Sequence, residues 1–183
     1  MPSRDLDPVT RLTADTVGVP GRRSFFLQAA SGADQVTLLL EKEQVRALAE
    51  RLQSLLPEMA AEHPEDPDEA RAAEAGELSL MEPLEPDFRV GQLSLDYDSG
   101  RDRFVMVATE LTAAEADEDT APPEPPEPRE VRLWVTRPQL RVLARHGAQV
   151  VARGRPPCPL CGNPLDPTGH VCPALNGHRP TVA

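Results

Sequence analysis

The spacing of apolar residues in the first half of the chain predicts two strands followed by one helix. Residues 24–30 (SFFLQAA) and 35–41 (QVTLLLE) are rich in apolar side chains and are bounded by glycine and charged residues, which is typical of strands. The apolar residues that follow recur at steps of three and four, and this period places them on one face of a helix. They are Val45, Leu48, Ala49, Leu52, Leu55, Leu56 and Met59.

The second half of the chain shows the same order of elements. Residues 88–98, 102–111 and 131–136 predict three strands, and the turn sequence Asp98-Ser99-Gly100 separates the first two. A second helix follows, with an inner face made of Leu140, Leu143, Ala144, Val150 and Val151. Strands grouped in runs before each helix predict an α+β fold with a mainly antiparallel sheet and two amphipathic helices.

The two strand–helix junctions align with each other at an offset of 95 residues. VTLLLEKEQVRALAERL begins at Val36 and VRLWVTRPQLRVLARHG begins at Val131, so that Gln44 aligns with Gln139. In the second copy Thr136 and Gln139 have the spacing of a capping box. The similarity fits an internal duplication of a strands-then-helix unit, and it equally fits convergence on a common amphipathic pattern.

Two segments interrupt these patterned regions. Residues 61–87 and 113–130 are acidic, rich in proline and poor in large apolar side chains. Segments of this kind bury too little apolar surface to offset the entropy lost on ordering. We therefore expect two flexible acidic loops.

Charge is distributed unevenly along the 183 residues. The net charge is -11, yet residues 129–183 contain eight basic side chains, all arginine, and only two acidic ones. Solvated arginines explain this surplus, and so does a basic face that meets an anionic partner. The chain has no stretch near the roughly 20 apolar residues that a membrane helix needs. Its first residues also lack the apolar core of a secretory signal, so we expect a cytoplasmic protein.

All three cysteines lie in CPLCGNPLDPTGHVCP, residues 158–173. Cys158 and Cys161 form a C-x-x-C pair, and His170 and Cys172 supply a second pair nearby. Three sulfur ligands and one nitrogen ligand are typical of a closed tetrahedral zinc site. We therefore predict a structural zinc ion, because four protein ligands leave no coordination position for a reacting water.

His178 is the alternative fourth ligand. We favour His170, since it lies beside Cys172 on the short loop whereas His178 belongs to a polar tail. The zinc would order a tail too poor in apolar residues to fold alone. This predicts a body over residues 1–153 and a zinc knuckle over residues 154–183.

Four sequence segments carry a resemblance to a known family. They are TVGVPGRRSFFLQA, LEKEQVRALAERL, FRVGQLSLDYD and GRPPCPLCGNPLDPTGHVCPALNGHR. Together they resemble an actinobacterial family of uncharacterised proteins, domain-of-unknown-function family 3090, whose most specific feature is the C-terminal CPLC…HxCP motif. The resemblance implies a small cytoplasmic protein with no established activity, and it supplies no catalytic residues.

Other candidate sites are few. Arg22 and Arg23 follow two loop glycines and could bind a phosphate or carboxylate, although an ordinary turn with solvated arginines explains them as well. His146 lies between arginines on the second helix, and we expect it to face solvent. No nucleophile elbow, P-loop or dinucleotide fingerprint occurs, so we assign no catalytic residue.

These observations support three functional hypotheses. The first is a non-enzymatic adaptor or regulatory protein whose zinc knuckle docks on a protein partner. The second is a nucleic-acid-associated protein that uses Arg153, Arg155 and Arg179, which we favour less because the chain has few aromatic residues. The third is an enzyme that binds a phosphorylated or other anionic substrate through Arg22 and Arg23.

Overall fold

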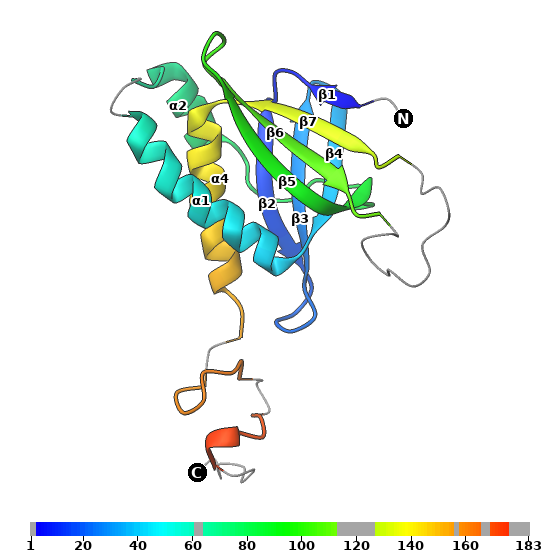
Figure 1. The fold of residues 1–183 in the computed structure, drawn as a ribbon, viewed down its shortest axis with the longest axis vertical. Helices are drawn as coiled ribbons and strands as arrows, with labels where there is room; N and C mark the ends of the chain where they lie inside the picture. Colours follow the sequence, from blue (N-terminus) through cyan, green and yellow to red (C-terminus); the bar gives the residue numbers. More distant parts are fainter. Residues whose placement is uncertain (1–2, 61–63, 113–126, 156–157, 166–168, 176–183) are drawn as a thin grey trace.

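The protein folds into a curled seven-stranded sheet covered by helices, with the knuckle beyond the last long helix (Figure 1). The computed structural model describes residues 3–60, 64–112, 127–155, 158–165 and 169–175. The strands are β1 (Arg4–Leu6), β2 (Arg11–Val17), β3 (Ser24–Ser31), β4 (Asp34–Leu40), β5 (Phe88–Asp98), β6 (Arg103–Glu110) and β7 (Glu130–Val135). The helical segments are α1 (Lys42–Ala60), α2 (Pro67–Ala75), α4 (Arg137–Ala152) and the short 3-10 turn η1 (Pro173–Leu175).

The order of the strands confirms the predicted α+β fold with a mainly antiparallel sheet. The order is β1-β7-β6-β5-β4-β3-β2. Two antiparallel meanders, β2–β3–β4 and β5–β6–β7, are each followed by a helix, α1 and α4 respectively. The meanders join through a short parallel pairing of β4 with β5, and β1 pairs in parallel with β7.

The sheet curls so that its two edges approach each other. β1 and β2 lie at opposite edges, and only the segment Asp7–Thr10 separates them in sequence. Within this segment the Val9 N–H donates to the Trp134 carbonyl of β7, and the Thr10 N–H donates to the Ala30 carbonyl of β3, at 3.0 and 2.8 Å. In Figure 1, β5, β6 and β7 accordingly cross in front of β2, β3 and β4.

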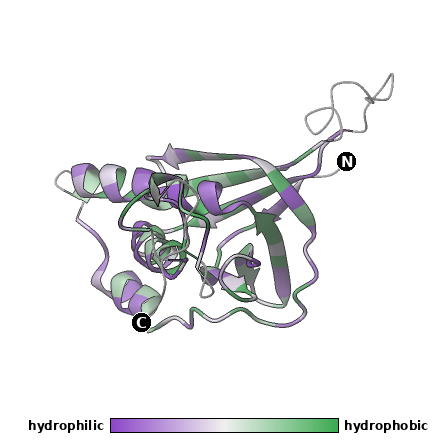
Figure 2. Cartoon of the chain, turned by 90° about the horizontal axis from the view of Figure 1, so that it is seen from below, coloured by the Kyte–Doolittle hydropathy of each residue, from purple (hydrophilic) through white to green (hydrophobic). Residues whose placement is uncertain are grey.

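Apolar side chains from the strands and helices form one core. Its fully buried members include Leu27, Leu38, Leu52, Phe104, Met106, Leu133, Leu140 and Leu143. Apolar and polar residues alternate along the helices, while some strands carry longer apolar stretches (Figure 2). None of the helices within the described ranges is long and apolar enough to cross a membrane.

Strand register supports the duplication that the sequence left open. In the first half Leu40 pairs with Phe25, Leu38 with Leu27 and Val36 with Ala29. In the second half Val135 pairs with Phe104, Leu133 with Met106 and Val131 with Ala108. The partners on β4 and β7 are those that the 95-residue offset aligns. All twelve side chains are buried, so the two meanders place matching residues in the core.

The starts of α1 and α4 are also built alike. Gln44 accepts a hydrogen bond from the Glu41 N–H at 2.8 Å, as Gln139 does from the Thr136 N–H at 2.9 Å. Thr136 adds a hydroxyl that accepts from the Gln139 N–H, which completes the predicted capping box. Each glutamine also donates to a carbonyl of a neighbouring segment, Val90 or Val9.

The predicted loop over residues 61–87 is wrong in part. Helix α2 lies within it, and Asp66 caps the helix by accepting from the Asp68 N–H at 2.8 Å. The chain after α2 then crosses the outer face of the first meander. There the Thr13 hydroxyl donates to the Leu78 carbonyl, and the buried Gln28 side chain bonds both backbone groups of Met81. Most of the second predicted loop, residues 113–126, lies outside the described residues.

Candidate metal centre

A tight turn after helix α4 brings the first two cysteines together. The Cys158 N–H donates to the Asn163 carbonyl, and the Gly162 N–H donates to the Cys158 carbonyl, each at 2.8 Å. Gly162 has a φ of 75°, a left-handed conformation that glycine adopts without steric cost. The second pair of candidate ligands returns on residues 169–172, immediately before η1.

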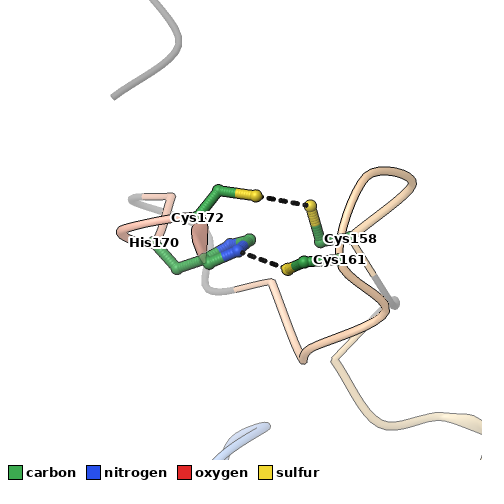
Figure 3. A group of neighbouring side chains, drawn as sticks. All are labelled: Cys158, Cys161, His170 and Cys172. Carbon is green, nitrogen blue, oxygen red and sulfur yellow. Dashed lines mark hydrogen bonds between the residues drawn. The ribbon is translucent and has the colours of Figure 1, made fainter. Parts of the chain in front are cut away.

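All four ligand atoms converge on one point. The Sγ atoms of Cys158, Cys161 and Cys172 and a ring nitrogen of His170 lie within 4.8 Å of one another. Cys158 Sγ is 3.9 Å from Cys172 Sγ, and Cys161 Sγ is 3.2 Å from His170 Nε2 (Figure 3). A tetrahedral zinc ion would hold two sulfurs about 3.8 Å apart, and sulfur and nitrogen about 3.5 Å apart. The cluster therefore has the dimensions of a site that could hold a metal ion.

The same distances argue against a disulfide. A disulfide bond needs two sulfurs about 2.05 Å apart, and all three cysteines are free thiols. Cys158 and Cys172 are buried, while Cys161 and His170 are half-buried. Among the described residues, the buried Nδ1 of His170 has no hydrogen-bond partner. Nε2 is thus the ring atom that faces the cluster.

The pKa values of Cys158 and Cys161 are shifted in opposite directions. Hydrogen bonds from the Leu160 and Cys161 N–H groups lower the pKa of Cys158, and the neighbouring thiols lower it further. A hydrogen bond from the Asn163 N–H favours a lower pKa for Cys161. Burial and the two other cysteines have the opposite effect and outweigh it, so the pKa of Cys161 is raised. Three thiols so close together cannot all ionise unless a cation compensates their charge. The donor set and its electrostatics therefore both fit a bound metal ion.

The other predicted site residues that the structure describes do not join this cluster. The alternative ligand His178 and the tail residue Arg179 lie outside the described residues. Arg22 is exposed in the loop of residues 18–23 between β2 and β3. Arg23 donates to the Val150 carbonyl of α4 at 3.2 Å and lies over the Phe25 ring. The binding of an anion by Arg22 and Arg23 stays a prediction.

His146 does not face solvent as we predicted. Its side chain is 11% exposed, and its Nε2 lies 3.7 Å from Asp15 Oδ2 on β2. Helix α4 packs against β2, a strand that the apolar pattern did not reveal. The expected solvent-facing position was therefore wrong because the neighbouring element was missing from the prediction.

Comparison with known proteins gives one match that covers most of the chain. No curated protein and no solved structure matches the sequence. A family model described as a protein of unknown function (DUF3090) matches residues 4–172. This range includes the four clustered ligands and ends before His178. The chain therefore belongs to the DUF3090 family.

Proposed function

We propose that the protein is a non-enzymatic adaptor or regulatory protein whose knuckle binds one structural zinc ion and docks on a protein partner. Zinc is the metal that the donor set favours, because thiolate and imidazole ligands suit it and suit magnesium or calcium poorly. When bound, it would cross-link the turn at Cys158 and Cys161 to the segment at His170 and Cys172. With four protein ligands it would have no open position for substrate.

The docking proposal is supported by the position of exposed apolar side chains. Among the described residues, the exposed large apolar side chains all lie in two segments. Leu160 and Val171, each 59% exposed, flank the metal ligands. Val17 and Val19, at 45% and 64%, lie at the end of β2 and in the loop that follows it. Large apolar side chains gathered on a surface are typical of protein–protein interfaces.

These two segments are neighbours in space although they are far apart in sequence. A Cβ atom placed on Gly21 of the β2–β3 loop would lie 3.5 Å from the Arg155 side chain. Gly21 and Pro164, which belongs to the loop between Cys161 and His170, line the same surface hollow. Figure 1 shows the β2–β3 loop at the end of the body where the tail begins. We refer to the exposed side chains of Val17, Val19, Leu160 and Val171, which belong to these two segments, as the apolar end.

The chemistry of the apolar end indicates what kind of partner it fits. Its side chains are aliphatic, the exposed Arg22 lies in the β2–β3 loop, and the exposed Arg153 follows the last residue of α4. A complementary surface would have an apolar centre with acidic residues at its rim. Nucleic-acid binding is less favoured, because the described residues of the knuckle include no phenylalanine, tyrosine or tryptophan on which bases could stack.

Elemental analysis of the purified protein tests the metal. We expect about one zinc per chain, lost in Cys158→Ser, Cys172→Ser and His170→Ala and retained in the matched control His178→Ala. Full zinc content in both cysteine variants would refute the site. Loss of zinc in His178→Ala together with retention of zinc in His170→Ala would identify His178 as the fourth ligand in place of His170.

Affinity capture from the native cell tests the docking surface. A true partner should be lost when Leu160→Asp or Val19→Asp places a charge on the apolar end, since a buried unpaired carboxylate opposes association. Ser54→Asp, which adds the same charge at an exposed position of α1, should retain it. Equal capture by all three variants would show that the partner binds elsewhere.

A further inference from the structure

A small hollow with a basic lining lies where the knuckle meets the body. Its volume is about 230 Å³. Three cationic side chains from three separate segments line it: Arg23 immediately before β3, Lys42 at the start of α1, and Arg155 after α4. The remaining lining residues are Gly21, Phe25, Gly154 and Pro164. We name it the junction hollow.

Two of these cations lie close together without a counter-charge among the described residues. A Cβ atom on Gly154 would be 3.2 Å from Arg23 Nη2 and 3.4 Å from Lys42 Nζ, so both charged ends approach the same glycine. Arg23 and Lys42 are half-buried, and neither forms an ion pair within the part of the chain that the structure describes. Like charges held this close repel each other.

The carboxylates nearest to Lys42 in sequence are already paired elsewhere. Glu41 forms an ion pair with Arg89, and Glu43 forms one with Arg46 at 3.0 Å. The first turn of α1 therefore supplies no negative charge to the hollow. Its aligned peptide dipoles instead add a partial positive charge at this end of the helix.

A shortage of acidic residues does not explain the uncompensated charge. The chain has 30 acidic and 19 basic side chains. Most arginines in other regions of the described structure are paired with carboxylates, although Arg11 and Arg51 are not: Arg4, Arg46, Arg71, Arg89, Arg101, Arg103, Arg129, Arg132, Arg137, Arg141 and Arg145 are paired. An acidic protein that leaves Arg23 and Lys42 side by side has an arrangement suited to an external anion.

We propose that the junction hollow binds a phosphate group, either inorganic phosphate or the phosphate of a small phosphorylated molecule. Two guanidinium groups and an ammonium group can surround the oxygens of a dianion, and arginine in particular can bond two of them at once. A single carboxylate carries half that charge, which is less than the combined charge of Arg23 and Lys42. Glycine at positions 21 and 154 leaves the space that a side chain would otherwise fill.

The proposed phosphate site extends the anion-binding prediction and changes its residues. Arg23 keeps its place, but Arg22 does not line the hollow, and Lys42 and Arg155 join it from distant parts of the sequence. Pro164 of the knuckle is one of the residues that line the hollow, so a bound phosphate would lie between the knuckle and the body. Neither the identity of the metal nor the docking partner enters this inference.

Calorimetric titration of the full-length protein with sodium phosphate tests the site. Lys42→Gln and Arg155→Gln should each weaken phosphate binding about tenfold or more, because each removes one charge-assisted hydrogen bond. Arg51→Gln is the matched control, since Arg51 is an exposed cation of α1 with no ion pair within the described residues and lies outside the hollow. It should change the affinity by no more than about twofold. Thermal unfolding verifies that each variant is folded, and Arg23 is left intact because it also bonds α4.

Two results would overturn the proposal. One is phosphate binding that is undetectable in the folded wild type, or that weakens as much in Arg51→Gln as in Lys42→Gln. The other comes from titration with a synthetic peptide of residues 113–130, which carries the chain's own acidic sequence. Binding of this peptide that depends on Lys42, without binding of phosphate, would assign the hollow to carboxylates.

Discussion

The body and the knuckle are ordered by different kinds of contact. In the body, side chains such as Leu27, Phe104 and Leu133 are fully shielded from solvent and pack between the sheet and two helices. In the described part of the knuckle, the cysteines Cys158 and Cys172 are buried while Leu160 and Val171 are exposed. The knuckle thus shields its four candidate ligands more than the apolar side chains of Leu160 and Val171. The difference suggests that ligand–metal bonds replace a hydrophobic core there.

Metal removal should have the largest effect, and it should be confined to the knuckle. Binding of structural zinc contributes about 10 to 16 kcal/mol in isolated zinc-finger peptides, and the knuckle has little apolar burial to replace it. After chelation we expect fast amide hydrogen exchange from about Gly154 onward and unchanged exchange in the strands. Global unfolding on chelation would mean that the knuckle belongs to the main core and that the comparison is wrong.

A cavity in the core should destabilise the body and leave the metal content of the knuckle unchanged. Phe104→Ala removes a buried ring from β6 and should lower the free energy of unfolding by about 3 to 5 kcal/mol. Zinc content at pH 7 should remain unchanged, because the three cysteines lie in the knuckle and Phe104 lies in β6. Urea denaturation and elemental analysis measure the two quantities. Leu160→Ala is the control in the knuckle and should change the free energy of unfolding by less than about 0.5 kcal/mol.

The smallest effect should come from one ion pair of the body. The pKa of Glu110 lies below its ordinary value because Arg129 donates hydrogen bonds to its carboxylate, including Nε to Oε2 at 2.8 Å. A lowered pKa in the folded state gives stability that is present above the unfolded value, about 4.3, and is lost as the pH falls through the folded value. Both side chains are partly exposed, at 27% and 48%, so the contribution should be below about 1 kcal/mol.

Glu110→Gln checks this ion pair by urea denaturation at several pH values. The variant should be slightly less stable than the wild type at pH 7, and the difference should shrink toward the lowest pH tested, as the pH falls through the folded value. An equal difference at both pH values would show that Arg129 stabilises the fold through packing and not through the charge of Glu110.

Local patterns predicted the elements whose burial is apolar and periodic. The helical stripes around Leu52 and Leu143 and the capping box at Thr136 needed no information from distant residues, and the structure contains all three. The predicted metal ligands likewise lie within fifteen consecutive residues, so their spacing alone brought them together in the prediction.

Elements that depend on polar burial or on distant partners were missed. Strand β2 was not predicted, because it buries Thr13 and contains Asp15, which interrupt an apolar pattern. The segment after α2 has an acidic composition typical of a loop, yet two hydrogen bonds between Met81 and the Gln28 side chain hold it against the sheet. The junction hollow joins Arg23, Lys42 and Arg155, and no local rule relates positions so far apart.

The parallel pairing of β1 with β7 has a consequence for the timing of synthesis. Arg4 pairs with Val131, so β1 is synthesised well before its partner β7, the last strand of the described sheet. At the usual rate of 5 to 20 residues per second, the delay is on the order of ten seconds. During this interval the first meander can form, because its strands are neighbours in sequence. β1 has no partner yet, because β7 has not been synthesised. Newly made chains should therefore spend their longest aggregation-prone period with the N-terminal strand unpaired, and chaperones have most opportunity to act at that stage.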